Sequence, residues 1–90
     1  MKTYHYVVKG LVQGVFFRLN TKDAAINYNI NGTVKNLHNG DVEVYAQGPE
    51  KNITRFEKFL DTGPSLARVD EVTREEIELD ESFSGFDVIY

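Results

Sequence analysis

The tripeptide His38-Asn39-Gly40 is the sequence feature that most restricts how this chain can fold. It separates two short strand-like runs, residues 33–37 and 41–47. Asn-Gly between two such runs is the strongest short-range signal of a β-hairpin, because a type I′ turn needs positive φ at both central residues. We therefore expect these two runs to pair as adjacent antiparallel strands in the middle of the chain.

Strand and helix patterns flank this hairpin on both sides. Tyr4, Tyr6 and Val8 alternate with more polar residues, which is the period of a strand with one buried face. Thr21 is predicted to be the N-cap of a first helix, and Pro49 suits the first turn of a second. In chain order the predicted elements are a strand over 3–9, a helix over 21–29, strands over 33–37 and 41–47, a helix opened by Gly48-Pro49 and closed by Gly63-Pro64, and strands over 68–79 and 86–90.

This order is β-α-β-β-α-β with a short final strand, which is the split βαβ, ferredoxin-like pattern. The predicted fold class is therefore α+β, with an antiparallel-dominated sheet and two helices on one face. A right-handed crossover makes the first two strands parallel, and the hairpin then inserts the third strand between them. The loop 10–18 and Asn36 are thus expected at one sheet edge, two strand spacings or roughly 9–10 Å apart.

Composition excludes several classes of protein. Cysteine is absent from all 90 residues, which excludes a disulfide scaffold, cysteine zinc sites and a thiol nucleophile. No apolar run approaches the ~18 residues of a membrane span, and the N-terminus lacks the apolar segment of a secretory signal. We therefore expect a cytoplasmic protein that has no membrane partner.

The charge is unevenly distributed along the chain. The net charge of −4 argues against a dedicated nucleic-acid binder. Residues 1–40 hold five basic residues and one acidic residue, Asp23, whereas residues 61–90 hold two basic and nine acidic residues. A chain with its positive charge in one half can host a small anion there, although an ordinary acidic surface is the simpler interpretation. The acidic stretch 75–81 is predicted to form a solvated hairpin or loop.

Two sets of residues could carry chemistry at the predicted sheet edge. A glycine-containing loop before a helix can turn successive backbone N–H groups inward to bind an anion, and Arg18 would add a planar fork of donors suited to phosphate. The alternative is a plain turn at Gly14 with a solvated arginine. Asn36 shares a strand face with Val34 and should point inward, where its amide needs hydrogen-bond partners; the alternative is a cap of the hairpin.

Two segments closely resemble the signatures of the acylphosphatase family. Residues 10–18, which read GLVQGVFFR, resemble the first signature, and residues 32–42, which read GTVKNLHNGDV, resemble the second. The Gly63-Pro64 break and the final residues 86–90 are also similar, so the likeness covers nearly the whole chain. Phe16 departs from the pattern, because many members have glycine there.

The resemblance implies one acylphosphatase-like domain over residues 1–90, acting as a monomer. It implies an enzyme that hydrolyses the carboxyl-phosphate bond of a small-molecule acyl phosphate to a carboxylate and inorganic phosphate, with no metal and no cofactor. Arg18 would be the catalytic arginine, and Asn36 would orient the attacking water. The phosphate would be bound by backbone N–H groups of Gln13, Gly14, Val15, Phe16, Phe17 and Arg18.

Other readings of the sequence remain. The same fold could serve as a non-catalytic anion-binding or protein-interaction module. An RNA-binding sheet would need stacking aromatics on an exposed strand face, where this chain offers only Tyr45 beside Glu43. His5 and His38 are the only histidines; both are predicted to be exposed, and two histidines without cysteine make a poor zinc site.

Overall fold

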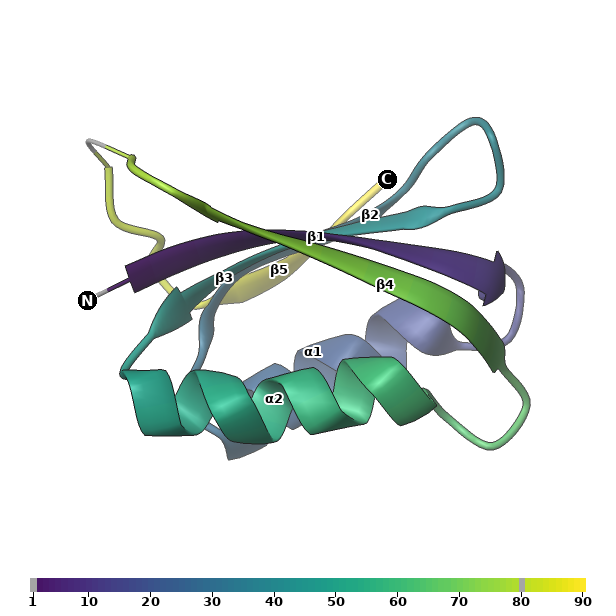
Figure 1. Ribbon diagram of the computed structural model, residues 1–90, viewed down its shortest axis with the longest axis horizontal. Helices are drawn as coiled ribbons and strands as arrows, with labels where there is room; N and C mark the ends of the chain where they lie inside the picture. Colours follow the sequence, from purple (N-terminus) through teal and green to yellow (C-terminus); the bar gives the residue numbers. More distant parts are fainter. Residues whose placement is uncertain (1, 80) are drawn as a thin grey trace.

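The computed structural model describes residues 2–79 and 81–90. Figure 1 shows a twisted sheet with both helices packed beneath it. The elements in chain order are β1 (Lys2–Leu11), α1 (Phe17–Asn27), β2 (Asn31–Asn36), β3 (Val42–Gly48), α2 (Glu50–Thr62), β4 (Arg68–Ile77) and β5 (Phe86–Ile89). No helix in these described ranges is long and apolar enough to span a bilayer.

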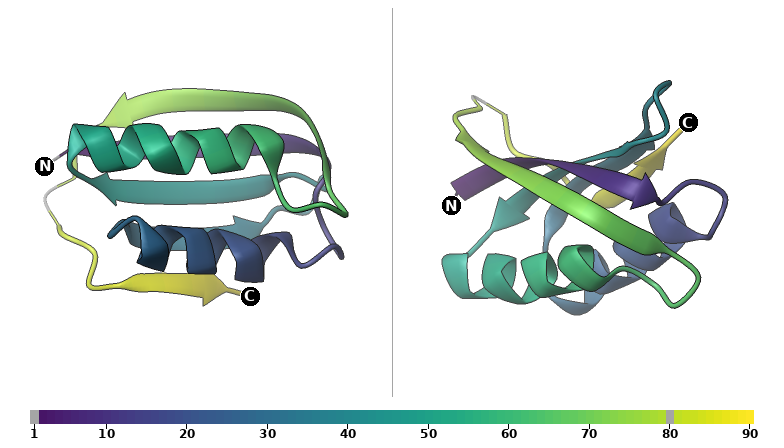
Figure 2. Two further views of the ribbon diagram at one scale, coloured as in Figure 1. Left: turned by 90° about the horizontal axis from the view of Figure 1, so that it is seen from below. Right: turned by 45° about the vertical axis from the view of Figure 1, so that its right-hand side comes forward.

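The sheet has the strand order β4-β1-β3-β2-β5. β3 lies between β1 and β2 and is antiparallel to both, so β1 and β2 run parallel, as the crossover argument predicted. β4 pairs antiparallel with β1, and β5 pairs parallel with β2 at the other edge. The two helices lie side by side on one face of the sheet (Figure 2). The predicted α+β fold class and element order are confirmed.

The core lies between this sheet face and the helices. Tyr4, Tyr6 and Val8 of β1 point into it and are at most 1% exposed, which confirms the alternation read from the sequence. The helices supply the opposite wall of the core. Its buried helical side chains are Phe17, Thr21 and Ala25 of α1 and Ile53, Phe56 and Leu60 of α2.

The start of α1 differs from the prediction. The helix begins at Phe17, not at Thr21, and its N-cap is Phe16 in a left-handed conformation, φ 60° and ψ 21°. Asn20 donates its N–H to the Phe16 carbonyl at 3.0 Å and closes the first turn. Thr21 is buried inside the helix, where its hydroxyl donates to the Phe17 carbonyl at 2.7 Å. The hydroxyl that suggested a cap is satisfied by its own helix.

The acidic stretch was also placed too completely in a loop. β4 runs to Ile77, so Glu75 and Glu76 are strand residues, paired with His5 and Tyr4 of β1. Asp80, in the same stretch, lies outside the described residues. Edge strands tolerate such residues because one side of the strand faces water and charge discourages pairing with another chain.

The prediction for His5 was half right. The ring lies on the sheet face away from the helices, as expected, but its side chain is only 25% exposed. Its Nε2 lies 2.9 Å from Glu43 Oε2, and its ring centroid lies 4.8 Å from that of Tyr45. Cross-strand contacts with β3 therefore cover a residue that alternation alone placed in solvent.

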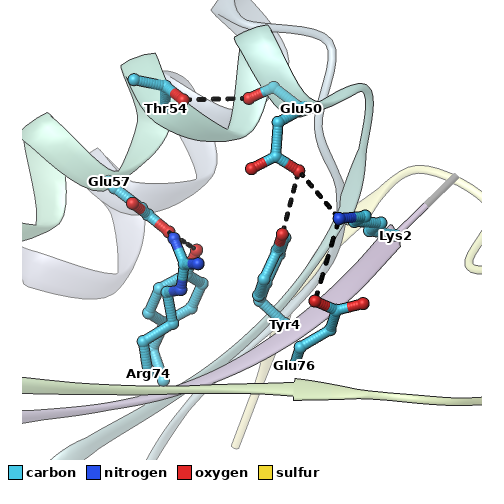
Figure 3. Close-up of polar contacts among 8 residues, drawn as sticks. Lys2, Tyr4, Glu50, Thr54, Glu57, Arg74 and Glu76 are labelled. Atoms are coloured by element: carbon cyan, nitrogen blue, oxygen red, sulfur yellow. Dashed lines mark hydrogen bonds and ion pairs between the residues drawn. The ribbon is translucent and has the colours of Figure 1, made fainter.

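A cluster of polar contacts joins α2 to β1 and β4 of the sheet. The Tyr4 hydroxyl donates to Glu50 Oε2 at 2.9 Å, and the Lys2 ammonium lies 3.8 Å from the same oxygen (Figure 3). The Tyr6 hydroxyl donates to Glu57 Oε2 at 2.6 Å. Arg74 of β4 donates to that oxygen at 2.7 Å. The two largest core side chains of β1 thus keep their polar ends satisfied at the helix surface.

Candidate active site

A cavity of about 300 Å³ opens at the sheet edge where β1, β2 and β5 all end. Its lining comes from the segment after β1, the first turn of α1, the last residue of β2, and β5 with the residue after it. The lining residues are Val12, Gly14, Phe16, Phe17, Arg18, Leu19, Asn36, Val88 and Tyr90. The predicted meeting of loop 10–18 with Asn36 is therefore what the fold produces.

The loop between β1 and α1 has the backbone of an anion cradle. Gly14 has φ 73° and Phe16 has φ 60°, so left-handed residues interrupt the chain twice before the helix begins. Such alternation turns neighbouring N–H groups toward one side. Within the described part of the chain, the backbone N–H groups of residues 13–18 have no hydrogen-bond acceptor. Three of them belong to or adjoin the first turn of α1, where the helix dipole also favours an anion.

The ends of this loop are anchored in the core. Val12 and Phe17 are each 1% exposed. The Asn20 side chain donates a second hydrogen bond to the Phe16 carbonyl at 2.9 Å and fixes the start of the helix. The exposed middle of the loop is therefore short and held at both sides, which favours a defined backbone shape over a floppy one.

Arg18 lies in the first turn of α1 and lines the cavity. Its NH1 reaches the carbonyl of Ile89 at 3.4 Å, and its Cζ lies 4.6 Å from the centroid of the Tyr90 ring. Neither contact neutralises the guanidinium charge. The remaining donors of the planar fork have no acceptor among the described residues and are suited to an anion's oxygens.

Asn36 ends β2, opposite Val42 of β3. Its side chain lines the cavity, and its Oδ1 is buried without a hydrogen-bond partner among the described residues. The hairpin-cap alternative, in which the amide bonds to nearby backbone, receives no support from this oxygen. Buried polar atoms are nearly always hydrogen-bonded, so this oxygen is suited to a donor that enters through the cavity.

Not every predicted phosphate-binding residue lines the cavity. Gly14, Phe16, Phe17 and Arg18 do, whereas Gln13 and Val15 do not. The Gln13 side chain turns away and donates to backbone carbonyls of the β2–β3 hairpin. A role for Gln13 and Val15 in binding would therefore have to come from their backbone N–H groups.

β5 also contributes to the cavity, which the sequence pattern did not reveal. Val88 and Tyr90 line the cavity because β5 pairs parallel with β2 and so ends at the same edge. The alternation of Phe86, Val88 and Tyr90 was visible in the sequence and placed them on one face. The sequence did not show that β5 pairs with β2, because the alternation within one strand carries no information about its neighbour in the sheet. Leu19 was missed since the predicted helix began after it.

His38 does not take part in this site. It is exposed in the hairpin, as predicted, and does not line the cavity. Across residues 2–79 and 81–90, no group of three or more histidine or acidic side chains is placed to hold a metal ion. The polar groups that the cavity lining offers include the Arg18 guanidinium, the Asn36 carboxamide and backbone amides.

The fold and the cavity define a small α+β protein with a glycine-containing loop, an arginine and an asparagine gathered at one end of a ferredoxin-like sheet. The model of the Acylphosphatase family matches residues 4–88. An acylphosphatase of Vibrio vulnificus (strain CMCP6) is 49% identical over 84 residues, covering 93% of this chain and 92% of the relative.

Solved structures agree with the sequence relatives. The crystal structure of acylphosphatase from Bacillus subtilis has a TM-score of 0.95 at 32% identity and covers 100% of both chains. An acylphosphatase structure from Coxiella burnetii has a TM-score of 0.92 at 41% identity, covering 98% of this chain and 92% of the other. The chain belongs to the acylphosphatase family, enzymes that hydrolyse the carboxyl-phosphate bond of acyl phosphates.

Proposed function

We propose that hydrolysis takes place in the cavity at the β1–β2–β5 edge, with the loop 13–18 and Arg18 holding the phosphoryl group and Asn36 holding the attacking water. The observation that carries this proposal is the buried, unpartnered Oδ1 of Asn36 in the same cavity as Arg18. The same cavity thus offers the donors of Arg18 to an anion and the acceptor of Asn36 to a neutral donor such as water.

Binding of the phosphoryl group follows from charge and geometry. Phosphoryl transfer is mostly a matter of positioning and charge stabilisation. The guanidinium of Arg18 can donate two parallel hydrogen bonds to phosphoryl oxygens, and the free amides of residues 13–18 can surround the remaining ones. Donors fixed in advance stabilise the charge that develops in the transition state without reorganisation.

Asn36 has a different task. A carboxamide cannot act as a base near neutral pH, but its Oδ1 can accept a hydrogen bond from water and direct a lone pair toward phosphorus. The water oxygen bonds to phosphorus as the bond from phosphorus to the acyl oxygen breaks. The carboxylate leaves with that electron pair, and the proton of the water passes to a phosphate oxygen of the substrate. A carboxylate is a good leaving group, so no strong general acid is required.

The partners of the reaction are small. The family implies an acyl phosphate as substrate and inorganic phosphate as product. We propose that the chain acts as a cytoplasmic monomer and binds no nucleic acid. The net charge of −4 supports the last point, because a phosphodiester backbone would be repelled.

The test is hydrolysis of a synthetic aryl acyl phosphate by the wild type, Arg18→Ala and Asn36→Ala. Arg55→Ala is the matched control, because Arg55 is exposed on α2 and does not line the cavity. We expect turnover to fall in the first two variants and to persist in the control. Wild-type turnover in a folded Arg18→Ala or Asn36→Ala protein would show that this cavity does not perform the reaction as proposed.

A further inference from the structure

The side chain of Gln13 links the two halves of the proposed site. Its Nε2 donates to the carbonyl oxygens of Leu37, at 2.7 Å, and Asp41, at 2.8 Å. Leu37 directly follows Asn36 and closes the β2–β3 hairpin, because its own N–H donates to the Asp41 carbonyl at 2.8 Å. One carboxamide therefore bridges the anion loop and the strand end that carries Asn36.

The chemistry of this link is specific to a primary amide. One neutral nitrogen supplies two N–H donors, and each is directed to a different carbonyl oxygen. Gly40 also donates its N–H to the Leu37 carbonyl, at 3.2 Å. Gln13 thus takes up the remaining acceptor capacity of the two carbonyls that define the base of the hairpin.

This link is also the loop's attachment to the hairpin. Val12 and Phe17 anchor the loop in the core on either side. Within residues 2–79 and 81–90, the two bonds from Gln13 are the hydrogen bonds that join residues 13–16 to the β2–β3 hairpin. Without them the loop and the end of β2 would be related through the core and through the pairing of β1 and β2 with β3.

We propose that Gln13 is a positioning residue for hydrolysis, whose side-chain amide sets the separation between the phosphate-binding loop and Asn36. The inference rests on the proposed function, in which the loop holds phosphorus and Asn36 holds the water. Attack requires phosphorus and the water oxygen to approach within about 3–3.5 Å in the correct direction. Gln13 touches neither of them and acts through the two segments that do.

The experiment measures kcat, phosphate affinity and thermal stability for Gln13→Leu. This variant replaces the carboxamide by an apolar side chain of similar size and so removes both donors. Gln13→Met, which is unbranched and of similar length, is the second variant in case the first does not fold. A misplacement of about 1 Å can cost on the order of 100-fold in rate, so we expect kcat to fall roughly 10- to 100-fold. Phosphate affinity should change much less, because the loop and Arg18 remain.

Asn39→Ala is the control for hairpin stability. The Asn39 amide donates to Asp41 Oδ2 at 3.1 Å, and its Oδ1 accepts the Asp41 N–H at 3.0 Å. This variant loosens the same hairpin without cutting its link to the loop. We expect a lower melting temperature with kcat close to that of the wild type.

The Gln13→Leu, Asn36→Ala double variant separates positioning from a purely structural role. If Gln13 acts through Asn36, the two rate losses do not multiply, because the second change removes a partner that is already gone. Multiplied losses, or full kcat in folded Gln13→Leu and Gln13→Met, overturn the inference. Rate loss in Arg18→Ala and Asn36→Ala without loss in the Gln13 variants overturns this inference alone, whereas wild-type rates in all of them overturn the proposed function as well.

Discussion

The guanidinium of Arg18 lies against the ring of Tyr90, with Cζ 4.6 Å from the ring centroid, although Tyr90 itself is 91% exposed. A ring beneath a guanidinium attracts its charge and orients its plane. The carbonyl of Ile89 accepts a hydrogen bond from NH1 of the same group. Ile89 at the end of β5 and Tyr90 directly after it therefore orient the guanidinium of Arg18 toward the cavity.

Arg18 variants should separate charge from geometry. Inorganic phosphate at 100 times its dissociation constant is expected to raise the free energy of unfolding of the wild type by about 2.7 kcal/mol. Arg18→Ala should abolish that gain, and Arg18→Lys should restore little of it, since an ammonium lacks the planar fork. Urea unfolding with and without phosphate at matched ionic strength measures the effect. Equal stabilisation of Arg18→Ala and wild type would place the anion site elsewhere.

Asn36 variants should lower the rate without removing phosphate binding. Asn36→Ala is expected to reduce kcat on the order of 10²–10³-fold, as for the loss of one preorganised polar group. Phosphate should bind it almost as it binds the wild type, because the proposed partner of Asn36 is the water. Asn36→Asp keeps the shape but adds negative charge, so it should lose phosphate affinity as well. Turnover and phosphate affinity of both variants check this prediction.

The stability of Asn36→Ala provides its own control. Oδ1 has no hydrogen-bond partner in the described part of the chain, so its removal leaves no other group unsatisfied. The variant should melt within a few degrees of the wild type, corresponding to at most about 1 kcal/mol. Strong destabilisation would mean that the carboxamide supports the hairpin, and the rate loss would then need another explanation.

Chelation should not remove activity. One guanidinium and a row of amides can supply the charge stabilisation that a metal supplies in other phosphoryl-transfer enzymes. We expect full turnover after dialysis against EDTA and in its continued presence. Activity that disappears on chelation and returns with Mg²⁺ or Zn²⁺ would contradict the proposed mechanism.

The folded protein should lose stability at alkaline pH. Burial, and then the hydrogen bond to the Glu57 carboxylate, raise the pKa of the Tyr6 hydroxyl well above its ordinary value of 10.0. Above pH ~10 the unfolded chain releases this proton while the folded chain retains it, so the free energy of unfolding falls. The urea midpoint is therefore expected to be level at lower pH and to fall as pH rises past 10. Tyr6→Phe should show a shallower fall, and an unchanged slope would assign the loss to other groups.

Phe16→Gly should stabilise the fold. Phe16 is 66% exposed and has φ 60°, a conformation that costs an L-residue roughly 1–2 kcal/mol and glycine almost nothing. Glycine loses more backbone entropy on folding, which offsets part of this relief. The expected net gain in the free energy of unfolding is therefore about 1 kcal/mol. Phe16→Ala removes the ring but keeps Cβ, so it should show no such gain. Equal stability of the two variants would indicate that the backbone at Phe16 is unstrained.

The sequence alone predicted the fold and the meeting of two residues of the candidate site, Arg18 and Asn36, but not the whole of the site. The Asn39-Gly40 signal was right about the pairing of β2 with β3 but wrong about the turn, because Gly40 has positive φ and Asn39 does not, so the turn is not type I′. Together with the crossover rule it places Asn36 beside the segment that leads into Arg18, and both residues line the cavity. These inferences rest on local turn chemistry and chain topology, which a single sequence records. The roles given to the two residues are still predictions.

The remaining features depend on long-range contacts. Thr21 looked like an N-cap because its hydroxyl type suits one, but burial against the core decided its place within α1. Tyr90 looked like an ordinary end of an alternating strand. The pairing of β5 with β2 is what brings its ring against the guanidinium of Arg18. The side-chain bridge from Gln13 joins residues 24 and 28 positions apart, and no sequence pattern signals such a contact.

The strand order β4-β1-β3-β2-β5 also determines when the proposed active cavity can form during folding. Val8 of β1 pairs with Val42 and with Val72, and Gly32 of β2 pairs with Phe86. Only the β2–β3 hairpin can close locally, and every other pairing has to pay the entropy of a long chain loop before it gains contacts. Such topologies fold more slowly than helical bundles. A chain still emerging from the ribosome without β5 would lack Val88 and Tyr90 of the cavity lining. If hydrolysis takes place in this cavity as proposed, recovery of activity on refolding should follow the docking of β5.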